Sequence, residues 1–590
     1  MEIVHRMEKA LTWRALLIIW ILLFQVLMLI YQPSLPTPFL YDDFTNIVLN
    51  EDLRADRPVA AILGDHPTSL RFDRRPIGGV VTLFNFWAGG LNEKVFRATN
   101  VVIQWLCAGA LGWLAILIAE RVRSFPAPRL FSAALMILWA VHPIQSTAVI
   151  YITQRMELLM TLFFFLSCAC LLVSTSGPAS SRWWRAGAAM AAFLCLLSKE
   201  NGAGLILLLA VLDRLFVVGS WRGVLKRHWF FYTALTVGWA AAAVWFFTGP
   251  RVAEWNDIPE LSHPWKYFQT QCFVVFGYFK LIFWPSPLVF APVPRVAETL
   301  VDWFPGGAAL ALIFGWWALK AKQTPWLWVP WLAVLLVLAP TSSFIPVPLE
   351  PAFDYRMHLP SAGALAVVLA AAWAALNKLS VKPAGMAAGL GLCIIALGAG
   401  THYRASVYAK PGTIWMDTAA KEPENVKAWF NITAILIEMN KLNEAKAAAG
   451  QAELANQRFQ QKWISAQYEV MMGLIAEKEQ QWEQARQHYT KAIESQPDHP
   501  EARIELSRVL IYLDRPEEAL STLEGHAAQK SALSVEGQIW KAVALNRVGR
   551  LEEAREAASK ADSVRAFPSH LEERRKLMHD ELRSGAGKAE

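Results

Sequence analysis

The stretch ALLIIWILLFQVLMLI, residues 15–30, is the first of a series of long apolar runs. A helix that crosses a bilayer needs about 20 mainly apolar residues. Similar runs, separated by short polar segments, continue to about Gly400. Of the 590 residues, 55% are hydrophobic and 18% are charged, whereas a soluble domain carries about 25% charged residues. These features predict an integral membrane protein.

Eleven apolar stretches are predicted to be transmembrane helices, several of them short: 14–31, 97–119, 129–143, 155–173, 185–198, 203–218, 229–247, 305–320, 326–340, 361–377 and 384–401. Two further apolar stretches, 76–91 and 266–284, are interrupted by polar residues or proline. We expect these two to form interfacial or re-entrant helices. No small-residue cleavage site follows the first run, so we predict an uncleaved signal anchor.

Basic residues in the short loops predict the orientation, because cytoplasmic loops are enriched in Lys and Arg. With the N-terminus in the cytoplasm, the basic residues gather in the loops 120–129, 174–185, 213–228, 320–323 and 377–382. An odd number of spans then places the C-terminal part of the chain outside.

From Thr413 onward the sequence is typical of a soluble helical protein, and it repeats. An Ala beside acidic or amide residues recurs as Ala445, Ala485, Ala519 and Ala554, at spacings of 40, 34 and 35 residues. The tetratricopeptide repeat (TPR), a pair of helices, is 34 residues long. We predict an all-α chain with a polytopic transmembrane domain (1–404), a TPR α-solenoid (413–570) and a charged flexible tail (571–590). Such solenoids bind peptides and proteins on a concave face; the alternative is a rigid cap that binds nothing.

Composition argues against several other classes. The net charge of +7 arises from Lys and Arg in short loops, so no nucleic-acid partner is predicted. All six Cys lie inside apolar stretches, and neither a disulfide framework nor a zinc spacing is present. The residues indicate no metal site, although the use of a divalent metal ion stays an open alternative.

Charged residues close to membrane depth are functional candidates because their burial is costly. In the predicted topology the unusual polar residues fall on the outer face: Asp42, Asp43, Arg75, His142, Arg155, Glu157, Lys199, Glu200, Asp354, Arg356 and His358. Singly, the acidic pair could be a solvated loop or a helix cap, and the other charges could be ion pairs that anchor helices. Their common location favours a shared function.

Carboxylates and cations together suit the transfer of a group from a lipid phosphate. A carboxylate can act as general base on an acceptor hydroxyl, and Arg or Lys can stabilise the charge of a departing phosphate. The chain has no glycine-rich nucleotide motif. This favours a lipid-linked donor over a nucleotide sugar.

Several segments together resemble one family. They are YDDF (41–44), Arg75-Pro76, Phe96-Arg97, HPIQSTAV (142–149), RMELL (155–159), SKENG (198–202) and DYRMHLPS (354–361). The set is similar to the transmembrane-and-TPR O-mannosyltransferase-like family of the GT-C superfamily of membrane glycosyltransferases. The resemblance covers most of residues 1–400, and the repeats follow in the same order. Gln154 stands where the family often has Gly.

This resemblance implies a GT-C-type transmembrane enzyme that moves a sugar from a polyprenyl-phosphate carrier to an acceptor outside the membrane, usually with inversion. Asp42 or Asp43 would be the base. The donor phosphate or carrier would be bound by Arg75, Arg155, Lys199, Arg356 and His358, with His142, Glu157, Glu200 and Asp354 in support. The expected location is a bacterial inner membrane with a periplasmic TPR domain, and the expected partner is an acceptor protein or glycan.

Two alternatives stay open at this point. The enzyme could act on a glycolipid or a cell-envelope polymer rather than on a protein. The chain could also be a non-catalytic TPR scaffold for secretion or pilus assembly, in which case neutralising Asp42 and Asp43 would have no consequence. The sequence names neither the sugar nor the acceptor.

Overall fold

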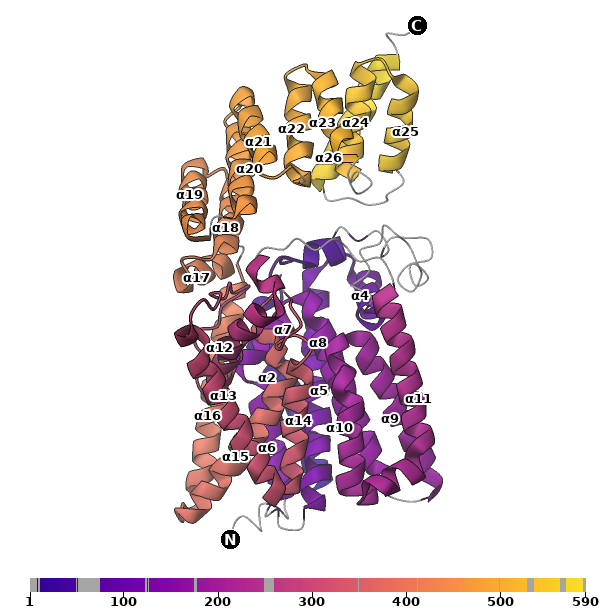
Figure 1. The fold of residues 1–590 in the computed structure, drawn as a ribbon, viewed down its shortest axis with the longest axis vertical. Coiled ribbons are helices and arrows are strands. Elements are labelled where there is room, and N and C mark those ends of the chain that lie inside the picture. Colours follow the sequence, from indigo (N-terminus) through magenta and orange to yellow (C-terminus); the bar gives the residue numbers. More distant parts are fainter. Residues whose placement is uncertain are drawn as a thin grey trace. The chain divides into compact units, whose positions relative to one another are not determined.

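The regular structure of the described residues is entirely helical in a computed structural model of the chain (Figure 1). The structure describes residues 8, 11–48, 50, 53, 75–122, 125, 127–174, 178–248, 259–347, 350–410, 412–459, 461–497, 499–527, 535–562 and 569–586. The chain divides into a membrane unit and a repeat unit, and the main division falls between Lys410 and Pro411.

The membrane unit is a bundle of helices (Figure 1). Its helices are α2 (Trp13–Tyr31), α4 (Pro76–Gly89), α5 (Glu93–Arg121), α6 (Pro128–Ala140), α7 (Ser146–Ile150), α8 (Arg155–Val173), α9 (Pro178–Ser198), α10 (Leu205–Leu212), α11 (Trp221–Thr248), α12 (Pro264–Phe283), α13 (Leu300–Gln323), α14 (Trp328–Leu338), α15 (His358–Lys378) and α16 (Pro383–Tyr408). Helix α8 packs against both α5 and α9, so it lies inside the bundle.

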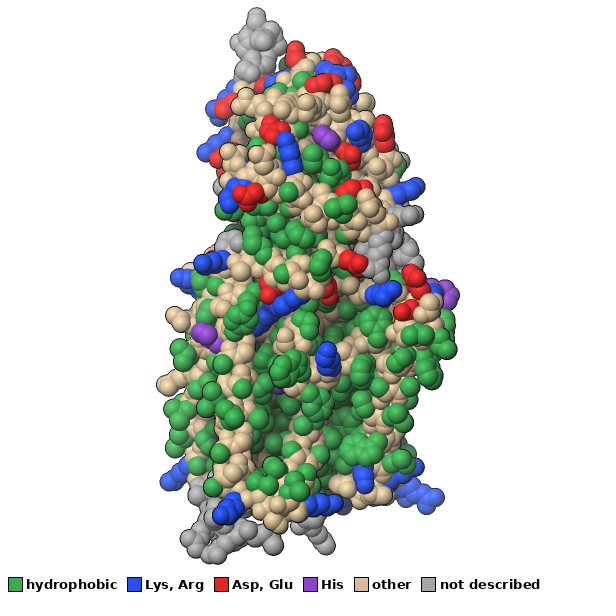
Figure 2. Space-filling view, turned by 90° about the vertical axis from the view of Figure 1, so that its left-hand side faces the viewer, with side chains coloured by type: hydrophobic (Ala, Val, Ile, Leu, Met, Phe, Trp, Pro, Cys, Tyr) green, Lys and Arg blue, Asp and Glu red, His purple; other side chains and the backbone are tan. Residues whose placement is uncertain are grey.

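Seven helical segments in the described residues are long and apolar enough to cross a membrane, or up to eight if one bent pair is a single span. They are 13–34, 93–121, 152–173, 200–218, 300–323, 354–378 and 383–408, with 128–140 and 143–150 as the bent pair. The apolar runs predict eleven spans. The expected spans 185–198 and 229–247 form parts of α9 and α11, which are not in this set, and 326–340 forms a shorter apolar helix. Figure 2 shows hydrophobic side chains covering the flank of this unit, with Lys and Arg side chains at its lower end.

A proline breaks the bent pair. The two halves meet at 53°, and Pro143 begins the short 3-10 turn η5 (Pro143–Gln145) between them. Proline lacks an N–H donor and disfavours helical geometry in the preceding residue. The chain therefore turns after α6, and α7 lies at the same end of the bundle as α4 (Figure 1).

The repeat unit begins with α17 (Thr413–Lys421) and continues as four helical pairs (Figure 1). The pairs are α18 (Val426–Glu438) with α19 (Leu442–Phe459), α20 (Lys462–Lys478) with α21 (Trp482–Ser495), α22 (Pro500–Tyr512) with α23 (Pro516–Ala527), and α24 (Val535–Arg547) with α25 (Leu551–Asp562). The recurring Ala445, Ala485, Ala519 and Ala554 are all fully buried. Their small side chains let the helices of a pair approach closely, as the repeat pattern predicts.

One repeat shows this close packing in detail. A Cβ atom added to Gly473 in α20 would lie 2.5 Å from a ring atom of Tyr489 in α21. Next along the chain, buried His499 precedes α22, and its Nδ1 accepts a hydrogen bond from the N–H of Ala502 at 3.3 Å. Its Nε2 lies 3.1 Å from Oε1 of Gln467. The neutral imidazole therefore acts as the helix cap.

The segment predicted to be a flexible tail is instead largely helical. Residues Ser569–Ala586 form α26. Met578 is fully buried in the core of the repeat unit, and Leu577 and Leu582 pack against that core. The charge content suggested a tail, but the apolar residues form a stripe at helical spacing, which stabilises the helix by burial.

Candidate active site

The loop after α2 carries the acidic pair, and Asp43 is locked inside it. Its side chain is fully buried. One carboxylate oxygen accepts from the N–H of Leu40 at 3.1 Å. The other accepts from the N–H of Thr153 at 2.8 Å and from its hydroxyl at 2.7 Å. Burial raises the pKa of Asp43, while nearby Arg97 and these hydrogen bonds oppose the shift. Asp43 thus joins the loop to the segment that precedes α8.

Asp42 occupies a different environment, because its side chain is only partly buried. Its backbone N–H donates to the phenolic oxygen of buried Tyr151 at 3.1 Å. The backbone of Asp42 is thus held by the Tyr151 hydroxyl, and the adjacent Asp43 is held by its own hydrogen bonds. Of the two acids, Asp42 is the one that a substrate can reach more readily.

Arg97, on α5, is bonded to the backbone of the loop just before the acidic pair. It is buried and donates to the backbone oxygen of Pro38 at 2.6 Å, and also to that of Thr37. A third bond, from Nε to the oxygen of Ile150, is 3.1 Å long. A guanidinium with several fixed donors suits this task, so Arg97 positions the acidic loop.

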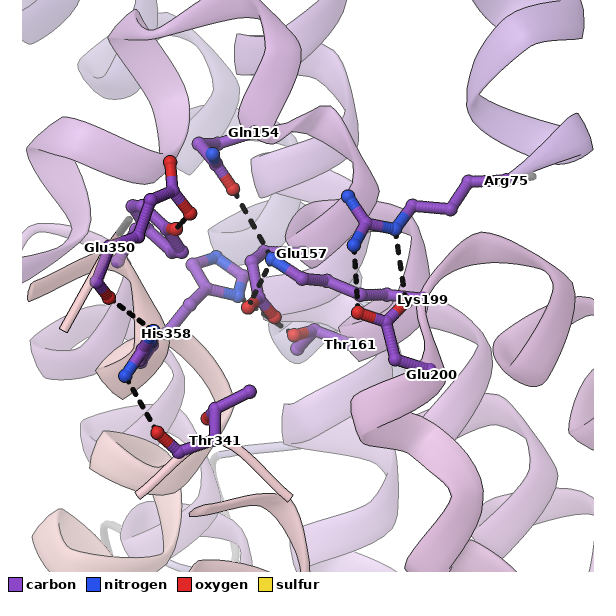
Figure 3. A network of polar contacts seen from close by, with 11 residues as sticks. Arg75, Gln154, Glu157, Thr161, Lys199, Glu200, Thr341, Glu350 and His358 are labelled. Carbon is purple, nitrogen blue, oxygen red and sulfur yellow. Dashed lines mark hydrogen bonds and ion pairs between the residues drawn. The ribbon is translucent and has the colours of Figure 1, made fainter. Parts of the chain in front are cut away.

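A buried ion pair lies at the start of α8 (Figure 3). The Nζ atom of Lys199 lies 2.9 Å from Glu157, and the two side chains are only 6% and 1% exposed. Lys199 also donates to Gln154 at 3.4 Å and lies 4.8 Å from the ring centre of Tyr355. Each of these neighbours restricts the cation, which is held between three elements of the fold.

A second ion pair lies beside the first and is more exposed. Arg75, just before α4, donates to both oxygens of Glu200, at 3.0 and 2.7 Å. The side chains of Arg75 and Glu200 are 19% and 43% exposed. Figure 3 shows the two pairs next to each other, since Lys199 and Glu200 are consecutive. Together the pairs place two cations and two carboxylates at one end of the bundle.

Tyr355 and Arg356 close this region from the side of α15. The Tyr355 hydroxyl bonds to the carboxylate of Glu350. Buried Arg356 donates to the backbone oxygens of Thr341 at 2.8 Å and of Glu350. Arg356 therefore organises the loop between α14 and α15, and its guanidinium is committed to protein oxygens.

The other predicted site residues are buried and bonded to neighbouring helices. Arg155 donates to Asn85 on α4 at 2.8 Å and to Thr82 at 3.1 Å. His358 lies 2.8 Å from Thr161 and 2.7 Å from Gln104. A ring nitrogen of His142 lies 3.0 Å from the backbone oxygen of Ile282, and Asp354 accepts from the hydroxyl of Thr147 at 3.2 Å. In these positions their polar groups join neighbouring elements of the bundle.

The short segment from Tyr151 to Glu157 connects the whole arrangement. Tyr151 and Thr153 hold the acidic loop, Gln154 and Glu157 hold Lys199, and Arg155 holds α4. This segment comprises η6 (Ile152–Gln154) and the first turn of α8. Chemically, the region offers a partly exposed carboxylate and restrained cations that are connected through this one segment. In the described residues, no group of three or more His, Cys, Asp or Glu side chains could hold a metal ion.

Sequence reasoning missed several residues of this region. Tyr151, Thr153 and Glu350 carry no signal in the sequence, because a Tyr, Thr or Glu near an apolar run is commonplace. Arg97 contributes with Phe96 to the family resemblance but was given no site role, although a charge so close to an apolar run could have marked it. Gln154, which stands where the resembling family often has Gly, has a role here because its side-chain oxygen accepts a hydrogen bond from Lys199.

These features define an all-α membrane protein that ends in helical repeats of the TPR type, with a polar cluster at one end of its bundle. The family described as tetratricopeptide repeat matches residues 476–532. This match covers the end of α20 and all of α21, α22 and α23, and it includes no residue of the membrane unit.

The chain is also a distant relative of protein O-mannosyl-transferases. It is 29% identical over 196 residues to the human protein O-mannosyl-transferase TMTC2, covering 31% of this chain and 22% of that protein. The Drosophila melanogaster Tmtc1 is 28% identical over 202 residues, covering 32% of this chain and 22% of that protein. The aligned stretches thus span about a fifth of the length of these relatives.

Among solved structures, a TPR protein from Thermus thermophilus is 19% identical, with a TM-score of 0.23 over 33% of this chain and 95% of that one. A TPR protein from Parabacteroides merdae is 10% identical, with a TM-score of 0.25 over 53% of this chain and 99% of that one. Scores this low add nothing to the description of the membrane unit.

Proposed function

We propose that this chain is a membrane glycosyltransferase that moves a sugar from a polyprenyl-phosphate carrier to an acceptor hydroxyl outside the membrane. The distant relation to protein O-mannosyl-transferases supports the reaction class. The observation that carries the proposal is the fixed Asp42–Asp43 loop, tied through Tyr151 and Thr153 to the segment that also restrains Lys199. An inverting transfer needs a base on one side of the sugar and a stabilised phosphate on the other.

In this mechanism Asp42 is the base and Asp43 is a positioning residue. Asp42 is partly exposed, whereas both oxygens of Asp43 are occupied by Leu40 and Thr153. Asp42 accepts the proton of the acceptor hydroxyl as its oxygen attacks the anomeric carbon. The bond from that carbon to the carrier phosphate breaks, and the polyprenyl phosphate leaves with the electron pair.

Lys199 and Arg75 are the proposed phosphate-binding cations. Both lie beside a carboxylate that restrains them, Glu157 and Glu200 respectively. Arg155, Arg356 and His358 act as positioning residues in this proposal, because each is bonded to neutral groups of other elements. Lys199 is also buried, but its partner is the carboxylate of Glu157, and it adjoins the more exposed Arg75–Glu200 pair. The positioning role of Arg155, Arg356 and His358 differs from the donor binding that the resemblance implies.

The proposed topology places the N-terminus in the cytoplasm and the repeat unit outside, in the periplasm of a bacterium. This arrangement follows from an odd number of spans, as in the eleven that the apolar runs predict. The repeat unit then recruits the acceptor, which we propose to be a protein. A glycolipid or envelope-polymer acceptor is the alternative outcome of the test.

The test is genetic. A deletion strain is complemented with wild type, with Asp42→Asn, with Asp43→Asn or with Asp514→Asn, and envelope proteins are analysed by intact mass. Asp514 is a matched control because it is an acid with a 93% exposed side chain in the repeat unit. Loss of a discrete sugar mass in the deletion strain and with Asp42→Asn, at normal protein level, supports the proposal. Full restoration by Asp42→Asn refutes Asp42 as the base, and full restoration by Asp43→Asn as well refutes the catalytic proposal and favours a non-catalytic scaffold.

A further inference from the structure

Glu350, in the loop between α14 and α15, is held in place by two contacts. Its carboxylate oxygen Oε2 accepts a hydrogen bond from the hydroxyl of buried Tyr355, and its backbone oxygen accepts one from Arg356. Figure 3 shows Glu350 in the same polar network as Lys199. Glu350 is only partly buried, so its carboxylate has a fixed position and is still open to a ligand.

This carboxylate differs from the others of the network because it is not paired with a cation. Glu157 pairs with Lys199, and Glu200 pairs with Arg75. Among the described residues, Glu350 forms no ion pair, and its second oxygen, Oε1, accepts no hydrogen bond. An ionised carboxylate can only accept hydrogen bonds. The free oxygen of Glu350 therefore suits a ligand that brings its own donors.

Tyr355 separates this carboxylate from Lys199, the proposed phosphate-binding cation. The ring centre of Tyr355 lies 4.8 Å from the Lys199 ammonium nitrogen, and the hydroxyl on the same ring bonds to Glu350. A single aromatic ring therefore spans the interval between the cation and the carboxylate. A hexosyl phosphate has a similar build, because its six-membered sugar ring is joined directly to the phosphate.

Sugar hydroxyls are the donors that suit an unpaired carboxylate. A hydrogen bond from a hydroxyl to a carboxylate is about twice as strong as a bond between neutral groups. A site that bonds a substrate hydroxyl also discriminates against an analogue without it, because the polar group of the site then loses its partner. A group held in advance loses less entropy on binding, and Tyr355 and Arg356 hold Glu350 in this way.

We propose that Glu350 binds hydroxyls of the sugar on the lipid carrier while Lys199 and Arg75 bind its phosphate, so that Glu350 determines which sugar is accepted. A phosphate at Lys199 places the attached sugar within reach of Glu350. Glu350 accepts hydrogen bonds in this role and takes no proton, which is the task of Asp42. This inference rests on the proposed transferase function and adds sugar recognition to the same site.

The test measures the binding of two synthetic lipids to the full chain in detergent. One is polyprenyl phosphate mannose, chosen because the chain is related to protein O-mannosyl-transferases. The other is polyprenyl methyl phosphate, which carries the same single charge and no sugar. Wild type should bind the mannosyl lipid at least about tenfold more tightly than the methyl lipid. Glu350→Gln should reduce this preference to about threefold or less and leave binding of the methyl lipid unchanged within about threefold.

Two further variants separate sugar recognition from phosphate recognition. Glu298→Gln makes the same change at an exposed position of the membrane unit and should keep the wild-type preference. Arg75→Gln should weaken the binding of both lipids to the same extent, because Arg75 acts on the phosphate that they share.

Three results would overturn the role of Glu350 and leave the transferase proposal in place. Glu350→Gln could keep the wild-type preference, or it could weaken the binding of both lipids equally. Wild type could also prefer none of the mannosyl, glucosyl and galactosyl lipids to the methyl lipid. If wild type binds none of these lipids, the donor class is wrong, and the transferase proposal fails together with the role of Glu350.

Discussion

Replacing Asp43 with Asn should destabilise the membrane unit, whereas Asp42→Asn should leave its stability unchanged and abolish transfer. The difference follows from their surroundings. Asp43 accepts on one oxygen from Leu40 and on the other from Thr153. An Asn that keeps its oxygen toward Thr153 must point its amide N–H toward the N–H of Leu40, so two donors face each other.

The magnitude comes from the bond that is lost. A hydrogen bond to a charged group contributes about 1.5–3 kcal/mol, and an unsatisfied buried donor costs about 1–3 kcal/mol. These two contributions describe the same hydrogen bond in part, so they do not add fully, and we expect the free energy of unfolding to decrease by about 3 kcal/mol. Since 1 kcal/mol shifts Tm by about 2–4 °C in a domain of about 150–250 residues and by less in a larger one, the expected decrease in Tm is about 5 °C.

The assay is thermal unfolding of the purified protein in detergent, combined with sugar transfer by the same sample. Asp43→Asn should melt lower and retain some transfer, and Asp42→Asn should melt like wild type and transfer nothing. The reasoning is refuted if Asp43→Asn melts within about 1 °C of wild type and is inactive. That result would make Asp43 the base and its hydrogen bonds unimportant for folding.

Three further predictions concern the ion pair and the repeats. Lys199→Met should destabilise the membrane unit by about 3–5 kcal/mol, because it leaves Glu157 buried without its partner. In the double variant with Glu157→Gln the melting temperature should recover, but sugar transfer should not, if Lys199 binds the donor phosphate. Burial lowers the pKa of His499 to about 4, below its usual 6.5, so the unfolded state binds the proton first and the repeat unit loses stability as pH falls from about 6.5 to 4. This loss of folding stability is at most about 3 kcal/mol. The variant His499→Asn keeps the helix cap, so it should flatten the pH dependence of amide hydrogen exchange in α22. An unchanged pH dependence in this variant would contradict the role given to His499. Gly473→Ala should destabilise the repeat unit by about 1–3 kcal/mol through overpacking against Tyr489. Gly450→Ala is the matched control, because an added Cβ atom there meets nothing within 4 Å, and it should stabilise α19 by about 0.5–1 kcal/mol. Equal melting temperatures for these two variants would show that the close contact between Gly473 and Tyr489 is unimportant.

The sequence predicts the helical class and the repeats well because both depend on local patterns. Apolar runs predict membrane helices, and the spacing of Ala445, Ala485, Ala519 and Ala554 predicts the buried contacts that the structure shows. The number of spans was less accessible. Whether an apolar stretch such as 185–198 crosses a membrane depends on the length and composition of the complete helix, which in α9 begins at Pro178 and includes Arg182 and Arg185.

The site illustrates a stricter limit. Asp42 and Asp43 are adjacent and chemically identical, and no pattern separates them. Only the tertiary structure shows that Thr153, 110 residues away, binds Asp43 and leaves Asp42 more exposed. The same holds for Arg155 and His358, which look like site cations in sequence but bond to Asn85 and Gln104 on other helices.

By itself, the sequence determined what depends on neighbours along the chain: membrane-forming apolar runs, helical repeats and the list of costly polar residues. The tertiary structure decided which of those residues share partners, because hydrogen bonds and ion pairs join groups that are distant in sequence. It also decided the fate of the C-terminal segment. The charges of residues 571–590 suggested a tail, but burial of Met578 against α24 makes most of that segment a helix.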